Sequence, residues 1–212
     1  MAKPLETKAV EQESKSDTIS NDDVSKTYDI PKTRLAVVCT KYGDPLTCVS
    51  VKEIPLLLPT KNEIMIKVRY CGLNPVDFKR VMGNLKTVQT KTFPWIIGSD
   101  YCGIIVKFGR NIKNDRRFDG FKIGTRVCGQ MAHMVQDGSF AEYININPYK
   151  TSIEIVPDNV RDMDAGALPL AGMTSYQGIK DYGKLKKDDK ILILGGSSGC
   201  GSIGISIAKA LG

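Results

Sequence analysis

Short apolar runs separated by glycine and proline follow one another from Thr33 to about residue 155. The segment EIMIKVRYCGL (63–73) alternates apolar and polar positions, as a strand with one buried face does. Further strand-like runs are TRLAVVCT (33–40), WIIGSDYCGIIVKFG (95–109), GTRVCGQM (124–131) and GSFAEYININ (138–147). Many short strands at near-regular spacing are typical of a sandwich or barrel, so we predict a β-rich domain over residues 34–160.

The pattern changes after Pro157. Residues 160–183 (VRDMDAGALPLAGMTSYQGIKDYG) predict helices around Pro169 and Gly172. The continuous apolar run ILIL (191–194) predicts a parallel strand covered on both faces, and ISIAKAL (205–211) predicts a helix. A glycine-rich segment, GGSSGCGSIG, lies between them and predicts a tight turn.

Residues 1–33 differ from the rest of the chain. They are rich in lysine, acidic residues, serine and threonine, with five basic and seven acidic side chains and one tyrosine. Such a segment buries too little apolar surface to become ordered, so we predict a disordered polar tail. It contains no apolar run typical of a secretory signal, and its acidic residues do not fit a mitochondrial transit peptide. We therefore expect a cytoplasmic protein without a membrane span.

Charge and cysteine content exclude several other classes of protein. The net charge is +7, but the basic residues are dispersed and no basic block contains interleaved aromatic residues. We therefore expect no nucleic-acid partner. None of the six cysteines forms a C-x-x-C pair, and His133 is the one histidine, so the spacing predicts no metal site.

The segment GGSSGCGSIG fits two motifs. Gly195, Ser197 and Gly199 match the G-x-S-x-G turn of serine hydrolases, which requires an acidic residue and then a histidine downstream. Neither follows Ser197, so we reject a hydrolase. No Lys-Ser or Lys-Thr follows the glycines, which also excludes a Walker-type phosphate loop.

The second motif is the G-x-G-x-x-G of dinucleotide-binding proteins. Gly199 would permit the tight turn, Gly201 would let the backbone approach a pyrophosphate, and Gly204 would allow the helix to pack closely on the strand. Free N–H groups at the start of the helix would then face the phosphates.

Five ordered segments, followed by this turn, resemble one known family. They are YCGLNPVDFKR (70–80), FPWIIGSDYCGIIVKFG (93–109), FKIGTRVCG (121–129), GSFAEYININ (138–147) and ALPLAGMTSYQGI (167–179). Together they resemble the N-terminal half of the medium-chain dehydrogenase/reductase superfamily, in its zinc-independent quinone oxidoreductase-like branch. The resemblance implies an α+β GroES-like catalytic domain followed by the first β-α unit of an α/β Rossmann domain.

The resemblance also bears on zinc. Zinc-dependent members place a cysteine where this chain has Asn74 and a histidine where it has Ser99. Because zinc prefers cysteine and histidine ligands, we expect no zinc. Asp77 and Asp100 are then expected to cap turns or to pair with a neighbouring basic side chain.

Residue roles follow from the resemblance alone. Asn74 would offer its amide to the substrate or to the nicotinamide edge, Asp77 would support that loop, and Thr174 would contact the nicotinamide half, with Tyr176 packed nearby. The cofactor-binding residues would be Gly195, Gly199, Cys200, Gly201 and Gly204, together with Thr174. The implied reaction is hydride transfer from NADPH, with NADP favoured over NAD, to a small-molecule quinone or conjugated carbonyl compound.

Two non-enzymatic alternatives stay open. One is a trafficking or scaffold protein that keeps this fold without its chemistry, and the other is a separate GroES-like interaction module. Residues 161–212 hold linker helices and only the first strand and helix of a Rossmann domain, which normally has about six strands. We therefore expect a truncated chain whose activity alone stays an open question, with exposed apolar faces in its last 50 residues or so, and a homodimer only for a longer form.

Overall fold

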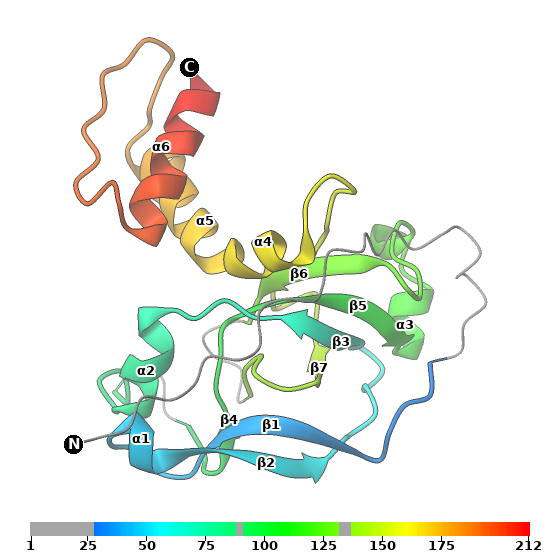
Figure 1. Ribbon diagram of the computed structural model, residues 1–212. Coiled ribbons are helices and arrows are strands. Elements are labelled where there is room, and N and C mark those ends of the chain that lie inside the picture. Colours follow the sequence, from blue (N-terminus) through cyan, green and yellow to red (C-terminus); the bar gives the residue numbers. More distant parts are fainter. Residues whose placement is uncertain (1–27, 88–90, 132–136) are drawn as a thin grey trace, which may run out of the picture.

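The computed structural model describes residues 28–87, 91–131 and 137–212 (Figure 1). The predictions for residues 1–27 and for His133 lie outside these ranges. The three-stranded sheet has the order β2-β1-β4, and the five-stranded sheet has the order β7-β3-β5-β6-β8, with antiparallel pairing throughout. The strands are β1 (Thr33–Cys39), β2 (Val49–Pro55), β3 (Ile64–Tyr70), β4 (Trp95–Ile96), β5 (Asp100–Phe108), β6 (Arg126–Gln130), β7 (Tyr143–Ile146) and β8 (Glu154–Ile155).

The core lies around the central strands β3 and β5. Ile64, Ile66, Tyr101 and Ile105 are completely buried there. The first seven residues of β5 are all buried, because side chains cover both of its faces. Gly103 is required at this point, since a Cβ there would lie 2.2 Å from the carbonyl oxygen of Lys67 on β3.

Residues 28–32 do not behave as a polar tail. Tyr28 and Ile30 pack against a cluster that includes Leu56, Met65 and Tyr143. The amide of Leu56 also donates a hydrogen bond of 2.9 Å to the carbonyl oxygen of Lys32. The predicted boundary at residue 33 is therefore wrong for residues 28–32, because two apolar side chains within the polar stretch have a core to join.

Helices connect the strands and extend beyond them. They are α1 (Pro45–Cys48), α2 (Pro75–Val81), α3 (Arg110–Lys113), the 3₁₀ turn η2 (Arg116–Phe118), α4 (Asp162–Ala167), α5 (Pro169–Tyr176), the π-helical segment η3 (Gln177–Tyr182) and α6 (Gly199–Leu211). Figure 1 shows α4 lying over β5 and β6, while α5 leads away from the sheets to α6. The α+β fold class predicted from the sequence is confirmed.

Asp162 fixes α4 to the large sheet. Its carboxylate accepts hydrogen bonds from Arg69 on β3 at 2.9 Å and from Arg126 on β6 at 2.6 Å. Burial alone would raise the pKa of Asp162, but the two arginines outweigh burial and hold that pKa below its usual value. The helix that begins the C-terminal region is thus attached to the β-rich domain by an ion-pair triad.

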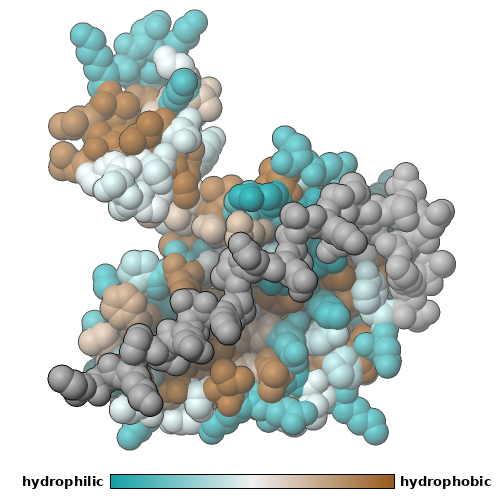
Figure 2. Space-filling model, viewed as in Figure 1, coloured by the Kyte–Doolittle hydropathy of each residue, from teal (hydrophilic) through white to brown (hydrophobic). Residues whose placement is uncertain are grey.

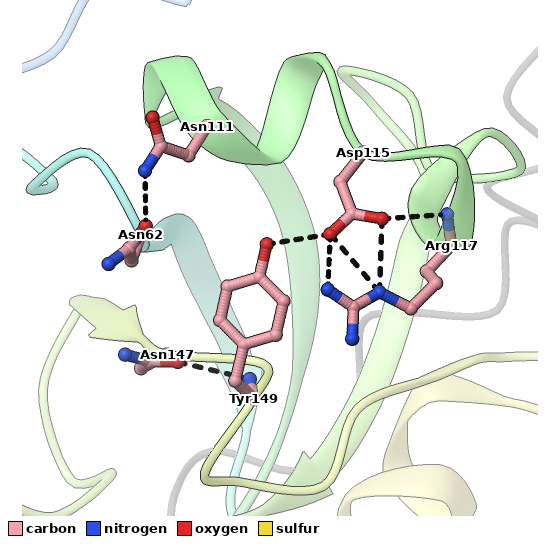
Figure 3. A network of polar contacts seen from close by, with 6 residues as sticks. All are labelled: Asn62, Asn111, Asp115, Arg117, Asn147 and Tyr149. Atoms are coloured by element: carbon pink, nitrogen blue, oxygen red, sulfur yellow. Dashed lines mark hydrogen bonds and ion pairs between the residues drawn. The ribbon is translucent and has the colours of Figure 1, made fainter.

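A polar network lies near α3 and η2, on the side of the domain away from α2 (Figures 1 and 3). Asp115 accepts a hydrogen bond from Arg117 at 2.6 Å and another from the hydroxyl of Tyr149 at 2.9 Å. The Arg117 guanidinium also lies 4.8 Å from the centre of the Tyr149 ring. These contacts join η2 to the turn after β7, and the hydrogen bonds from Arg117 lower the pKa of Asp115.

The predicted strand ILIL is not formed. Residues 191–194 have no strand pairing, and Leu192 and Leu194 are 84% and 85% exposed. A parallel strand requires a neighbour to accept its backbone hydrogen bonds, and no segment within the described ranges provides one beside these residues. The helix predicted over 205–211 is present, but α6 begins earlier, at Gly199.

Candidate functional site

The loop before α2 contains two of the predicted site residues. Asn74 is the N-cap of α2 and Pro75 is its first helical residue, as the sequence N-P-V-D favours. Asp77 accepts a hydrogen bond of 2.8 Å from the backbone N–H of Asn74, which closes the first turn of the helix. The structure therefore brings Asn74 and Asp77 together, and the Asp77 carboxylate stabilises the loop through its hydrogen bond with the Asn74 backbone.

A buried polar group lies directly behind this loop. The Ser99 hydroxyl donates to Asp77 Oδ1 at 2.6 Å, and Arg80 Nη1 donates to Ser99 Oγ at 3.1 Å. Ser99 is completely buried, and Asp77 and Arg80 are 4% and 6% exposed. Burial raises the pKa of Asp77, opposed by hydrogen bonds from Ser99 and Asn74 and by the charge of Arg80.

Asp100 holds the Asn74 side chain from the other direction. Its Oδ2 accepts a hydrogen bond from Asn74 Nδ2 at 2.8 Å, and its Oδ1 accepts one from the backbone N–H of Leu170 at 2.9 Å. Asp100 is completely buried, and burial raises its pKa to about 6. Asp100 thus has the structural role that was expected, because it accepts a hydrogen bond at the start of α5. Its two partners are amide N–H groups, however, and not a basic side chain.

These contacts bear on whether the site suits zinc. The Asn74 amide nitrogen donates to Asp100, and the Ser99 hydroxyl donates to Asp77, so hydrogen bonds occupy both positions that are ligands in zinc-dependent members. The thiol of Cys71 donates to the carbonyl oxygen of Ser139 at 3.3 Å, and burial raises its pKa to about 12. Among residues 28–87, 91–131 and 137–212, no group of three or more potential ligands is placed to hold a metal. These side chains do not fit a zinc centre.

Thr174 lies on α5, away from this loop. Its side chain is exposed, and no hydrogen bond in the described parts of the chain joins it to Asn74 or Asp77. Tyr176 is 45% exposed, so its expected packing is wrong, because it lies on the solvent side of the helix. Ser175 lies between them and was not predicted as a site residue. This buried residue has its Oγ 2.8 Å from the carbonyl oxygens of both Ala171 and Cys200.

The glycine-rich turn is built mainly by its own backbone. Ser198 is the N-cap of α6 and accepts a hydrogen bond from the N–H of Gly201 at 3.1 Å. Gly195 has a φ of +72°, which favours glycine. A Cβ at Gly201 would lie 2.1 Å from the carbonyl oxygen of Gly195, whereas one at Gly199 would meet nothing within 4 Å.

The turn presents a helix start to solvent. Cys200 is exposed, and Gly204 faces Ser175 and Ile179 closely enough that a Cβ would make ordinary contact with both. Gly204 thus permits close packing of α6 against the α5–η3 helix and also against Ile193 of the ILIL segment, which a Cβ would meet at 3.6 Å, although this segment forms no strand. The turn and the helix predicted from the glycine motif are formed, whereas the predicted strand before them is not.

Helix α5 joins the two halves of the site. Its N-terminus is bonded to Asp100 through Leu170, and Ser175 lies against Cys200 at the start of α6. An apolar hollow of about 310 Å³ borders the Asn74 loop on another side; its lining includes Leu35, Val37, Val51, Cys71, Leu73 and Phe140. The arrangement can orient an uncharged ligand, and it offers no solvent-exposed acid–base pair at Asn74.

The chain is similar to reductases and quinone oxidoreductases. Residues 60–157 match the alcohol dehydrogenase GroES-like domain. A 2-methylene-furan-3-one reductase of Solanum lycopersicum is 34% identical over 194 residues, which cover 88% of this chain and 47% of that protein. A chloroplast envelope quinone oxidoreductase homolog of Arabidopsis thaliana is 30% identical, with coverage of 82% and 52%. The chain thus spans about half the length of these relatives.

Solved structures give the same picture. A quinone oxidoreductase from Coxiella burnetii aligns with a TM-score of 0.71 at 28% identity, covering 85% of this chain and 55% of that one. A mycobacterial protein solved in complex with NADPH aligns with a TM-score of 0.70 at 25% identity, covering 84% of this chain and 51% of that one.

In the described ranges, no helix has the length and apolar character needed to cross a membrane. A cytoplasmic location stays a prediction, since one relative is named for the chloroplast envelope.

Proposed function

This chain belongs to the medium-chain dehydrogenase/reductase superfamily, in its quinone-oxidoreductase-like branch, and we propose that it serves the zinc-independent, NADPH-dependent reduction of a quinone or conjugated carbonyl compound. The observation that carries the proposal is the hydrogen-bonded pairing of Asn74 with Asp100 and of Ser99 with Asp77. In this arrangement, the Asn74 side-chain amide is held in place at the position where zinc-dependent members have a metal ligand. The names of the relatives and the NADPH complex of a mycobacterial neighbour support the same chemistry.

Residues of this chain would hold both reactants. The N–H groups of Gly199 and Cys200 at the start of α6 would face the pyrophosphate of NADPH, because those of Gly201 and Ser202 already bond to Ser198. Thr174 would contact the nicotinamide half. When bound, NADPH supplies the hydride, so the protein needs mainly to orient the reactants. Asn74 would donate its second amide N–H to the acceptor's carbonyl oxygen in place of its long contact of 3.5 Å to the Gly72 carbonyl, since Asp100 already takes the first.

The apolar hollow beside the loop supports an uncharged, ring-shaped acceptor. Its lining includes Cys71 and Leu73 from the loop, together with the aromatic ring of Phe140. Burial keeps the Cys71 thiol protonated at neutral pH, because its pKa is raised to about 12. A protonated thiol is a weak nucleophile, which favours survival of the protein beside an electrophilic quinone.

The test uses the purified 212-residue chain. NADPH binding is followed by the change in nicotinamide fluorescence, and turnover by loss of absorbance with a quinone and with a conjugated enone. We expect binding of NADPH, turnover that a zinc chelator does not change, and lower turnover for Asn74→Ala. If neither binding nor turnover occurs, the proposal fails and a non-catalytic scaffold or trafficking role is favoured. Turnover abolished by the chelator would contradict zinc independence.

A further inference from the structure

Asp100 connects the two elements that carry the proposed contacts to substrate and cofactor. It is the first residue of β5 and is completely buried. One carboxylate oxygen accepts from the Asn74 side chain on the α2 loop, and the other accepts from Leu170 at the start of α5. Helix α5 also carries Thr174 and contacts α6 through Ser175.

We propose that Asp100 is a positioning residue, which sets the Asn74 carboxamide and helix α5 relative to each other by giving one carboxylate oxygen to each. Its effect on reduction rests on the function proposed above, whereas the pairing itself does not. The local sequence explains why the N–H of Leu170 is available to Asp100. Pro169 is the first residue of α5 and has no N–H, so the N–H of Leu170 is the first available donor of the helix and has no acceptor within it.

The packing leaves this arrangement little freedom. A Cβ at Gly72 would lie 2.9 Å from the carbonyl oxygen of Gly166 and 3.2 Å from Asp100 Oδ2. The loop before Asn74, the end of α4 and the Asp100 carboxylate therefore meet at van der Waals distance. A change in the hydrogen bonds of Asp100 has to move Asn74 or α5, because the backbone around Gly72 has no space to absorb it.

The two hydrogen bonds require an ionised carboxylate. A carboxylate only accepts hydrogen bonds, and both partners here are N–H donors. An amide at this position directs N–H groups at one of the two donors and loses that bond, and a protonated carboxyl keeps only its carbonyl oxygen as a strong acceptor. The titratable groups that face Asp100 are Asp77 from α2, with Arg80 behind it, and the thiols of Cys71 and Cys128. Because burial raises the Asp100 pKa to about 6, the change falls within an accessible pH range.

Nuclear magnetic resonance of the isotope-labelled 212-residue chain tests the pairing without any activity. The probes are the Asn74 side-chain NH₂ and the Leu170 backbone N–H, followed from pH 4.5 to pH 8. We expect both signals to move with one shared midpoint near the Asp100 pKa of about 6. In Asp100→Asn neither should titrate in this way, whereas in Asp77→Asn the shared transition should remain. Different midpoints, or a shared transition that persists in Asp100→Asn, would overturn the proposal. If Asp100→Asn fails to fold, the wild type alone tests the proposal: a shared midpoint of the two signals supports it, and different midpoints contradict it.

Turnover with NADPH gives the second readout. A displaced Asn74 should lower kcat roughly tenfold or more in Asp100→Asn and should remove the pH dependence between pH 5 and pH 7. The matched control is Asp115→Asn, which changes a carboxylate in the network near η2 and should leave kcat and its pH profile unchanged. An unchanged kcat and pH profile in Asp100→Asn would contradict positioning. A wild type without turnover that still shows the shared midpoint would count against the proposed function alone.

Discussion

At the scale of single residues, the buried and half-buried carboxylates in the described parts of this protein differ in their partners and so in their pKa. Asp77 and Asp100 accept mainly from uncharged donors, and burial raises the pKa of each. Asp162 accepts from two arginines, and its pKa is lowered despite burial. The two kinds of carboxylate therefore affect folding in opposite directions as pH changes.

Removing the Asp162 carboxylate should destabilise the fold. We expect Asp162→Asn to lower the free energy of unfolding by about 2 kcal/mol at pH 7, because Arg69 and Arg126 lose a charged partner. The folded-state pKa is lowered, so this stabilisation is present above the unfolded pKa of about 4 and disappears as pH falls through the folded value. Urea unfolding at pH 7 and at pH 3 measures the difference.

The control for this prediction is Asp164→Asn. Asp164 pairs with Arg161 at 2.7 Å, but the two side chains are 51% and 71% exposed. Solvent screens such a pair, so we expect Asp164→Asn to change the free energy of unfolding much less than Asp162→Asn does. An equal effect of the two substitutions would show that the triad at Asp162 has no special role in holding α4.

Local sequence predicts part of the residue-scale picture. The N-P-V-D motif is sufficient to place Asn74 at an N-cap with Asp77 returning a hydrogen bond, because both partners lie in one turn. The bond from Asn74 to Asp100 spans 26 positions, and the bond from Leu170 spans 70. No spacing rule reports such pairs, since they depend on how β5, the loop and α5 pack.

At the scale of elements, the glycine-rich turn contains one glycine that the packing requires, Gly201, and one that it does not require, Gly199. We expect Gly201→Ala to destabilise the turn and α6 by roughly 1–3 kcal/mol, because its Cβ would overlap the Gly195 carbonyl oxygen at 2.1 Å. Gly199→Ala should leave α6 unchanged or slightly more stable, because its Cβ would meet open space within the helix. Amide hydrogen exchange along α6 distinguishes the two, and equal protection in both variants would refute this account of the turn.

Ser175 should link α5 to α6. We expect Ser175→Ala to lower protection of the α6 amides by about 1 kcal/mol, because the Cys200 carbonyl loses its hydroxyl donor. Ser206→Ala is the matched control, since this exposed hydroxyl bonds only within α6, to the Ser202 carbonyl at 3.2 Å. Hydrogen exchange that responds equally to both substitutions would contradict a link specific to Ser175.

The elements themselves were predictable to different degrees. Alternation over residues 63–73 predicted a strand with one buried face, and β3 forms there. Ile64, Met65 and Ile66 are nevertheless all buried, because two separate clusters cover both faces of its first half. The run ILIL has the composition of a buried parallel strand, yet it pairs with nothing in the described ranges. Strand propensity reports what fits a sheet, and pairing requires a partner that composition alone does not reveal.

At the scale of the whole molecule, apolar surface is unevenly distributed. Ile191, Leu192, Leu194 and Ile205 are 44%, 84%, 85% and 50% exposed. Figure 2 shows hydrophobic surface at the upper left, over the segment that precedes α6 in Figure 1. The β-rich domain has a core of buried aliphatic residues around β3 and β5, although Leu46, Leu57 and Leu73 are also exposed on its surface. Exposed apolar surface of this kind favours association, because burying it releases free energy.

The last prediction follows from this surface. We expect the 212-residue chain to associate in a concentration-dependent way, and the double variant Leu192→Lys with Leu194→Lys to sediment as a smaller species at the same concentration. The matched control is Leu46→Lys on α1, because Leu46 is 91% exposed but lies apart from the segment before α6. Sedimentation velocity across a range of concentrations measures the effect. If Leu46→Lys reduces association as much as the double variant, the effect is one of net charge, and the surface at residues 191–194 is not the site of contact.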